Sequence, residues 1–211
     1  MIDNARKFIF VHIPKTAGTS IEYSLRNEWP YTTAETSRGR KHKKLQNYIT
    51  DIPSPYIWEK KLRAEIIQNE YFTFSIVRNP WERAVSHYHF FKTTIRRDYG
   101  KQKYTNSFKE FIEHYTDHNN RTGWIKNDFS PQLDYLTING NISVDFVGRY
   151  ERLQQDFNII SGMLGRPLRT LNHIYKSNRA PYVKYYCNET IRMVYRRYEQ
   201  DIEYFKYRFN G

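Results

Sequence analysis

The chain has 211 residues, enough for one α/β domain that buries a core without covalent cross-links. Its single cysteine, Cys187, excludes an intramolecular disulfide framework and a multi-cysteine metal site. The 34 Lys and Arg against 22 Asp and Glu leave a net charge of +12, which predicts an anionic partner: nucleic acid, a membrane surface, an acidic polysaccharide or a phosphorylated cofactor.

The sequence contains no segment that approaches the ~20 consecutive apolar residues of a membrane-spanning helix. The first apolar run, Phe8 to Val11, is also too short for the core of a signal peptide. We therefore expect a cytoplasmic protein with no integral membrane segment. The missing N-terminal anchor favours a bacterial or otherwise cytosolic protein, or a trimmed form of a longer one.

The first predicted elements are a buried strand, a tight turn and a helix. Residues 7–13 are mostly β-branched or aromatic, which is typical of a parallel strand buried on both faces. Residues 14–18 form a turn, and Thr19 or Ser20 begins a helix that runs through Leu25. Strand, turn and helix in this order open a nucleotide-binding α/β unit.

A second strand is predicted further along the chain. Helices are expected near residues 44–48 and over 58–68, and residues 72–77 form a clear strand. Pro80 occupies the first position of the next helix, where its missing N–H costs nothing, and this helix reaches about Lys92.

The second half of the chain alternates helices with one short strand. Ser107 to Glu110 fits a capping box and predicts a helix, and residues 144–147 form a third strand. Residues 151–164 form a helix that Gly165 ends, and Asn188 is placed to cap the last helix.

The first candidate site is the loop of residues 12–20, between the first strand and its helix. The N-terminus of a helix directs backbone N–H groups and the positive end of the helix dipole at one spot, which binds phosphate or sulfate. Lys15 adds a full charge and Gly18 permits close approach of the backbone. The loop is not a Walker A motif, because its lysine precedes the glycine. The alternative is an ordinary turn with a surface lysine.

The second candidate site begins at Arg78, at the carboxyl end of the second strand. Its guanidinium is always charged and its fork of donors suits a phosphate. Ser86 follows eight residues later and reaches the same side only if the intervening chain starts as an irregular turn. The alternatives are a structural ion-pair partner for Arg78 and a buried helical serine for Ser86.

Residues 12–20 resemble the 5′-phosphosulfate loop of sulfotransferases that use PAPS (3′-phosphoadenosine 5′-phosphosulfate), and Arg78 with Ser86 resembles their 3′-phosphate site. Other segments are similar to the branch with heparan-sulfate uronosyl, chondroitin and bacterial carbohydrate sulfotransferases. These segments are Ser130 to Gln132, Gly148 to Phe157, Asn178 to Tyr182 and Tyr198 to Tyr207. The resemblance covers nearly the whole chain in order. It implies one domain, residues 1–211, with an α/β fold: a central parallel β-sheet flanked by helices, as in the P-loop-kinase-like sulfotransferase fold.

The resemblance also implies a role for each matching residue. Lys15 would lie beside the bridging oxygen and stabilise the charge that builds there as the S–O bond breaks. Arg78 and Ser86 would bind the 3′-phosphate, and Arg179 would close over it. The residues assigned to donor binding are Lys15, Thr16, Ala17, Gly18, Thr19, Ser20, Arg78, Ser86 and Arg179.

A general base must take the proton of the acceptor hydroxyl, and His42 is our choice. It lies between the two sites, where the catalytic histidine of the family commonly sits. The alternatives are a solvated histidine at position 42, with Glu22 or Glu82 as the base. A metal is not expected: His114 and His118 are four residues apart on a predicted helix, but no third ligand is in view.

We therefore expect a PAPS-dependent sulfotransferase that needs no metal, releases 3′,5′-adenosine bisphosphate and has no nucleic-acid partner. Its acceptor is expected to be a hydroxyl of a carbohydrate, and the basic run of residues 38–44 suits an acidic one. A small nucleotide kinase would instead turn over Mg²⁺ and ATP. A basic nucleic-acid-binding protein would lose affinity steeply with salt.

Overall fold

The computed structural model describes residues 1–28, 42–48, 60–92, 107–117, 129–168, 170–171 and 179–210. They divide into two compact units, each described here by itself. The first unit comprises residues 1–77 and 132–174, and the second comprises residues 78–131 and 175–211. The organisation of the chain as one domain stays a prediction.

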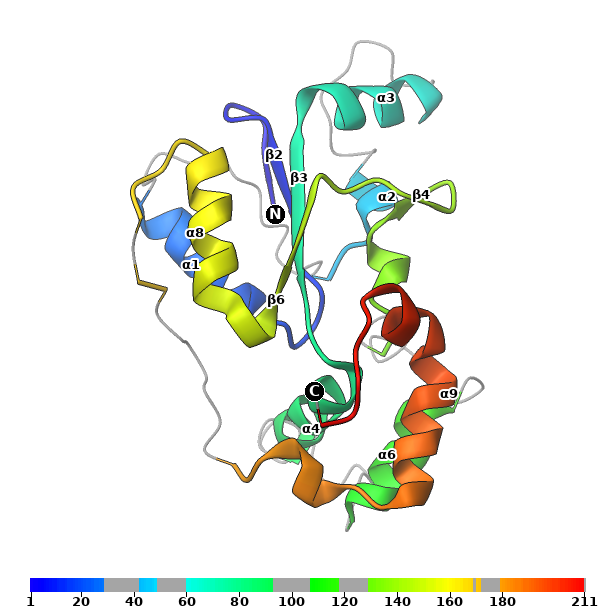
Figure 1. Ribbon diagram of the computed structural model, residues 1–211. Helices are drawn as coiled ribbons and strands as arrows, with labels where there is room; N and C mark the ends of the chain where they lie inside the picture. The colour runs from blue at the N-terminus through cyan, green and yellow to red at the C-terminus, as the bar shows by residue number, and fades with distance from the viewer. Residues whose placement is uncertain are drawn as a thin grey trace. The chain divides into compact units, whose positions relative to one another are not determined.

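The first unit is built on a four-stranded sheet with the strand order β1-β2-β3-β6 (Figure 1). Strands β2 (Phe8–Val11), β3 (Phe72–Val77) and β6 (Phe146–Arg149) are parallel. The sequence analysis expected a parallel sheet. The sheet is instead mixed, because β1 (Ile2–Asp3) pairs antiparallel with β2 at its edge. Two residues were too short a segment to be recognised as a strand.

Helices and short elements connect and cover these strands. They are α1 (Gly18–Glu28), α2 (Leu45–Tyr48), α3 (Lys60–Glu70), the 3-10 turns η3 (Leu133–Tyr135) and η4 (Tyr150–Arg152), the hairpin β4 (Thr137–Ile138) with β5 (Asn141–Ile142), and α8 (Leu153–Met163). The sequence analysis predicted both ends of strand β3 correctly. It predicted the helices α1, α2, α3 and α8 to within a few residues. Residues 58–59 of the predicted third helix lie outside the described part of the chain.

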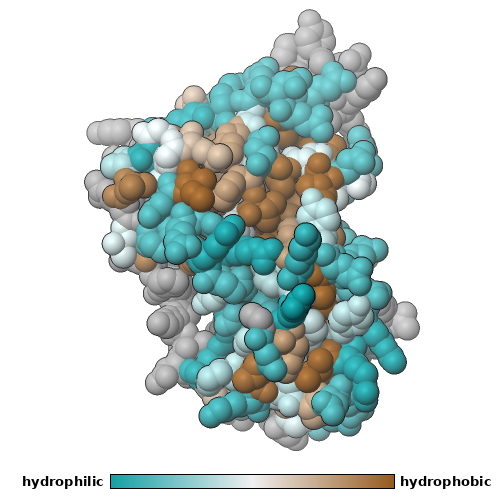
Figure 2. Space-filling model, in the orientation of Figure 1, coloured by the Kyte–Doolittle hydropathy of each residue, from teal (hydrophilic) through white to brown (hydrophobic). Residues whose placement is uncertain are grey.

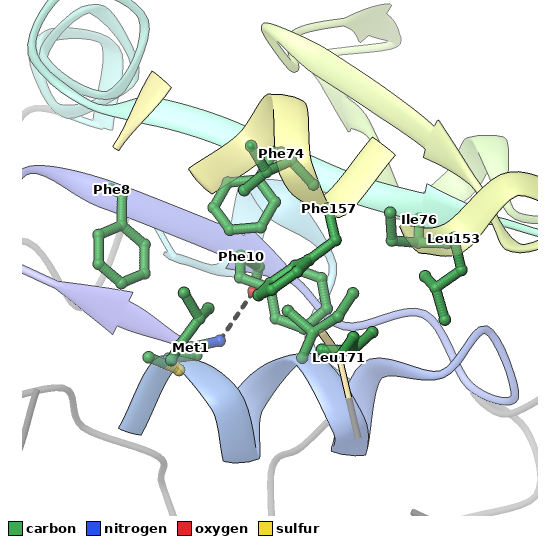
Figure 3. Packing of buried hydrophobic residues seen from close by; sticks show 11 residues of the cluster. Met1, Phe8, Phe10, Phe74, Ile76, Leu153, Phe157 and Leu171 are labelled. Atoms are coloured by element: carbon green, nitrogen blue, oxygen red, sulfur yellow. Dashed lines mark hydrogen bonds between the residues drawn. The ribbon is translucent and has the colours of Figure 1, made fainter. Parts of the chain in front are cut away.

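The core of this unit lies between one face of the sheet and the helices α1 and α8. Side chains alternate between the faces of a strand, so Phe8 and Phe10 point to one side of β2 together. The ring of Phe10 stacks on that of Phe74 from β3, with 5.2 Å between centroids. Phe157 of α8 packs into the same cluster (Figure 3). The helices α1 and α8 therefore hold the ends of the strands in a fixed arrangement.

Replacing Phe157 with alanine should lower the free energy of unfolding by about 3–5 kcal/mol, because it removes a large buried ring and leaves a cavity. The Phe157 side chain is 1% exposed and lies within the core cluster. Urea denaturation with a two-state fit measures the effect. Met163 on the same helix is 57% exposed, and its replacement with alanine should change the free energy of unfolding by less than about 0.5 kcal/mol. Equal losses in the two variants would contradict this assignment of the core.

The second unit contains the helices α4 (Pro80–Phe90), α6 (Phe108–Thr116) and α9 (Asn188–Tyr204), with a 3-10 turn η5 (Tyr182–Tyr185). Aromatic rings fill the space between the helices. Tyr115 of α6 lies against Tyr198 of α9 and against Phe129, with ring centroids 5.4 and 4.6 Å away. The Tyr198 hydroxyl donates to the carbonyl of Phe129, and burial raises the pKa of Tyr198 well above its usual value. The Tyr198 hydroxyl therefore stays protonated, and its hydrogen bond holds α9 against the backbone at Phe129.

Several element boundaries differ from the sequence-based expectation for local reasons. The third strand begins at Phe146, two residues later than predicted. Just before it, the Asp145 carboxylate accepts hydrogen bonds from the backbone N–H and the hydroxyl of Thr73, and the Asp145 N–H donates to the Thr73 carbonyl. The last helix is capped by Cys187, whose backbone N–H donates to the Thr190 hydroxyl, and Asn188 is instead its first residue.

None of the helices in the described part of the chain is long and apolar enough to cross a bilayer. On the face shown in Figure 2, hydrophilic side chains surround smaller groups of apolar ones.

Candidate functional site

The loop after β2 leads directly into α1 and carries Lys15. The Thr16 hydroxyl donates to the carbonyl of Ile13 at 2.9 Å, and the Thr16 side chain is fully buried. The backbone N–H of Ser20 donates to the carbonyl of Ala17 at 2.9 Å. These two hydrogen bonds stabilise the turn. Because the Thr16 hydroxyl already donates to Ile13, the backbone N–H of Thr16 is the group of this residue that suits an anion.

The backbone of this loop is unusual at two positions. Lys15 and Ala17 adopt positive φ angles of 67° and 68°, while Thr16 between them does not. Each left-handed residue with a side chain costs about 1–3 kcal/mol, and such residues gather at functional sites. Alternation of left-handed and ordinary residues turns successive backbone N–H groups toward one point, which forms a concave anion-binding nest. The first turn of α1 contains no acidic residue that would oppose an anion.

A buried, hydrogen-bonded pair of side chains lies at the base of the loop. His12 Nδ1 is 2.9 Å from Glu22 Oε1, and the two side chains are 4% and 8% exposed. Burial lowers the pKa of His12, although the hydrogen bond and the charge of Glu22 act to raise it. We therefore assign a neutral His12 ring that donates its Nδ1–H to an ionised Glu22. The sequence analysis placed His12 at the start of the loop and did not identify its partner.

His42 belongs to the same unit, and its ring lies near the loop. The ring centroids of His42 and His12 are 4.9 Å apart and the rings are inclined at 61°, an edge-to-face arrangement. His42 is partly exposed, as a group that exchanges a proton with a bound molecule must be. The structure thus places His42 close to the loop that carries Lys15. Residues 38–41 of the basic run lie outside the described residues.

The second unit brings two of the predicted site arginines together on one carboxylate. Glu82 Oε1 accepts from Arg78 Nη2 at 2.9 Å and lies 3.5 Å from Arg179 Nη2. The side chains of Arg78 and Arg179 are only 5% and 9% exposed. Sequence reasoning considered Glu82 only as an alternative base and missed that it joins the two arginines. The spacing of four residues between Arg78 and Glu82 was the available signal.

Ser86 lies on the face of α4 that carries Glu82. The two residues are four apart on this helix, so their side chains are neighbours on its surface. The chain turns sharply before α4, where the Asn79 side chain accepts from the backbone N–H groups of Trp81 and Glu82. Arg78 therefore lies outside the helix, and the placement of Ser86 on the same side as the Arg78 side chain stays a prediction.

A histidine on the same helix lies near the arginine pair but carries no charge of its own. His89 is hydrogen-bonded to the Tyr185 hydroxyl at 2.8 Å. Burial lowers the pKa of His89, and the positive charges of Arg179 and Lys92 lower it further. The ring is thus neutral at pH 7 and leaves the arginines as the charged groups.

The described residues hold no cluster of His, Cys, Asp and Glu side chains able to bind a metal ion. Of the predicted pair His114 and His118, the second lies outside the described residues.

Comparison with known proteins gives the class. Residues 1–208 match the model of a family described as "Sulfotransferase family", so the chain belongs to the sulfotransferases. A protein from Archaeoglobus fulgidus, described only as uncharacterized, is 32% identical over 98 residues, which is 46% of this chain and 70% of that protein. No solved structure gives a significant match. The family assignment supports sulfuryl transfer in general, and the carbohydrate branch is not resolved by it.

Proposed function

We propose that the protein transfers a sulfuryl group from PAPS to a hydroxyl of a carbohydrate by in-line displacement. The observation that carries this proposal is the loop of residues 12–17, in which two left-handed residues, Lys15 and Ala17, lead into a helix with no acidic residue in its first turn. In a sulfotransferase, a site of this kind suits the 5′-phosphosulfate of the donor.

Backbone amides, two hydroxyls and a lysine of the loop and the start of α1 bind the donor. The backbone amides of residues 16–19 and the hydroxyls of Thr19 and Ser20 hold the phosphosulfate. Lys15 stabilises the bridging oxygen, on which negative charge grows during transfer. A bond forms between the acceptor oxygen and sulfur, and the bond between sulfur and the bridging oxygen breaks. The electron pair stays on the phosphate of 3′,5′-adenosine bisphosphate, so positioning and charge stabilisation supply most of the catalysis.

His42 is the general base in this proposal and takes the hydroxyl proton. The pairing of the two other candidates supports this choice. Glu22 is buried against His12, and Glu82 is shared by Arg78 and Arg179. Each of these carboxylates already accepts a hydrogen bond from a neighbouring side chain, so it is less well placed than His42 to receive the proton of a bound hydroxyl.

Arg78, Ser86 and Arg179 bind the 3′-phosphate. The convergence of two guanidinium groups on one carboxylate oxygen supports this role, because groups that can share one oxyanion can also share a phosphate. Arg78 directly follows Val77, the last residue of β3, and β3 pairs with β2. The 3′-phosphate is also the group that distinguishes PAPS from ATP.

Replacing Arg78 with alanine should weaken binding of 3′,5′-adenosine bisphosphate by about 30- to 1,000-fold, because the variant loses a buried charged partner. Binding of 5′-AMP, which has no 3′-phosphate, should change by less than about threefold. Isothermal titration calorimetry with both nucleotides measures the difference. Arg196, exposed on α9 of the same unit, provides the control, and its replacement with alanine should leave both affinities unchanged. Equal losses for the two nucleotides in Arg78→Ala would remove the 3′-phosphate role.

Acceptor contacts are expected from residues 31–54 and 96–107, most of which lie outside the described residues. Incubation with ³⁵S-labelled PAPS and a panel of glycans, lipids and peptides tests the acceptor class. Labelling of a glycan is expected. Turnover of ATP with Mg²⁺ and none of PAPS would replace this proposal with a nucleotide kinase.

A further inference from the structure

We propose that His12 and Glu22 form a buried positioning pair that couples the phosphosulfate loop to His42. The inference rests on the proposed function, because it takes the loop of Lys15 as the donor site and His42 as the base. His12 touches neither donor nor acceptor in this scheme, and it receives no proton.

The His12 ring contacts three other side chains, those of Phe10, His42 and Glu22. The ring stacks on Phe10, with centroids 5.7 Å apart and an angle of 21°, and it meets His42 edge to face. Glu22 fixes the ring through Nδ1 at 2.9 Å. With 3% of its surface exposed, His12 can neither turn nor exchange partners with solvent. One rigid ring thus contacts both α1, through Glu22, and the candidate base.

The same ring lies directly against the start of α1. A Cβ atom added at Gly18 would lie 2.0 Å from His12 Cδ2 and 2.2 Å from His12 Nε2. No side chain fits in that space, so residue 18 must be glycine for the loop to reach α1 over the ring. The His12 side chain therefore contacts both the start of α1 and the ring of His42.

The charge state of the pair suits a neighbour that becomes positive. Taking the acceptor proton converts His42 to an imidazolium. A protonated His12 at 4.9 Å would oppose this step, but burial lowers the pKa of His12 and keeps the ring neutral. The Glu22 carboxylate lies against Nδ1 of His12. Glu22 also selects the tautomer of His12 with the proton on Nδ1.

The first test removes the polar pair but keeps a ring. The double variant His12→Phe/Glu22→Leu replaces both partners with apolar groups, so neither is left buried without its partner. We expect kcat to fall by about 10- to 100-fold, as for other residues that orient a catalytic group, while KM for PAPS changes by less than about threefold. Glu22→Gln keeps an acceptor for the Nδ1–H and removes only the charge, so its kcat should lie between those of the wild type and the double variant. Glu189→Gln, at an exposed ion pair with Lys109, is the matched control and should keep the wild-type kcat.

The second test uses the contact between the ring and the loop. Gly18→Ala should weaken binding of 3′,5′-adenosine bisphosphate by at least about tenfold, since the added methyl forces the ring or the loop to move. His12→Ala removes the ring and makes room for that methyl, so Gly18→Ala/His12→Ala should bind the nucleotide as well as His12→Ala alone. Independent effects that multiply in the double variant would show that the ring does not set the loop.

These outcomes separate the inference from the proposed function. A wild-type protein that does not turn over PAPS, or a His42→Ala variant at full rate, overturns the proposed function. An inactive His42→Ala variant together with wild-type kcat in both His12→Phe/Glu22→Leu and Glu22→Gln overturns only the positioning pair. If the double variant does not fold, the kcat of Glu22→Gln decides: a wild-type value rejects the pair, and a lowered kcat with unchanged KM supports it.

Discussion

Replacing Lys15 with alanine is expected to lower kcat by about 10²–10³-fold, the loss found when a preorganised group that stabilises developing charge is removed. The charge on the bridging oxygen is much larger in the transition state than in bound PAPS. The loss should therefore appear in kcat, whereas KM for PAPS should change little. The left-handed conformation at position 15 is equally open to lysine and alanine, so the backbone of the loop should persist.

Steady-state assay with ³⁵S-labelled PAPS measures this effect. Lys7 is the matched control, because it lies just before β2 and forms an exposed ion pair with Glu70. Lys7→Ala should keep the wild-type kcat. A Lys15→Ala variant with unchanged kcat and a raised KM would mean that Lys15 contributes uniform binding of the donor and not stabilisation of the leaving group.

Replacing His42 with alanine is expected to lower kcat by about 10²–10⁴-fold, the usual contribution of a positioned general base. Binding of 3′,5′-adenosine bisphosphate should change by less than about threefold, because the proposed contacts of His42 are with the acceptor. Imidazole added to the assay should restore part of the rate, since a small base can enter the space that the ring leaves. The rate and the nucleotide affinity are measured separately, by labelled transfer and by calorimetry.

His114, exposed on α6, is the control histidine, and its replacement with alanine should leave kcat unchanged. Transfer by His42→Ala at the wild-type rate would show that another group accepts the proton. A large loss of nucleotide affinity in His42→Ala would instead place this residue in the donor site. Only the combination of slow transfer, normal nucleotide affinity and rescue by imidazole supports the assignment as base.

The two variants probe opposite ends of one displacement. Lys15 acts where the bond to the leaving group breaks, and His42 acts where the acceptor loses its proton. Both residues belong to the first unit, together with the His12 and Glu22 pair. The residues assigned to the 3′-phosphate belong to the second unit, so the selectivity test on Arg78 examines that unit independently of the chemical step.

Local sequence information was sufficient for the main helices and for the three parallel strands, and it supplied the candidate site residues. Residues 72–77 form an apolar run that Arg78, Asn79 and Pro80 end, and the structure has β3 and the start of α4 at these residues. The loop of residues 12–20 was recognisable as a candidate anion site because its lysine, glycine and hydroxyls follow a buried strand directly. Such patterns depend on neighbours along the chain, which is the information that a sequence displays.

Pairings between distant segments required the tertiary structure. Glu22 and His12 are ten residues apart and meet only because α1 folds back beneath the loop, and Glu82 meets Arg179 across 97 positions. The sequence analysis also did not predict the antiparallel strand β1 or the left-handed backbone at Lys15 and Ala17. In each case packing against residues remote in the chain determines the conformation, because it outweighs the local conformational preference of the segment. The sequence thus indicated which groups could perform the chemistry, and the packing of α1 on the sheet decided which of them face each other.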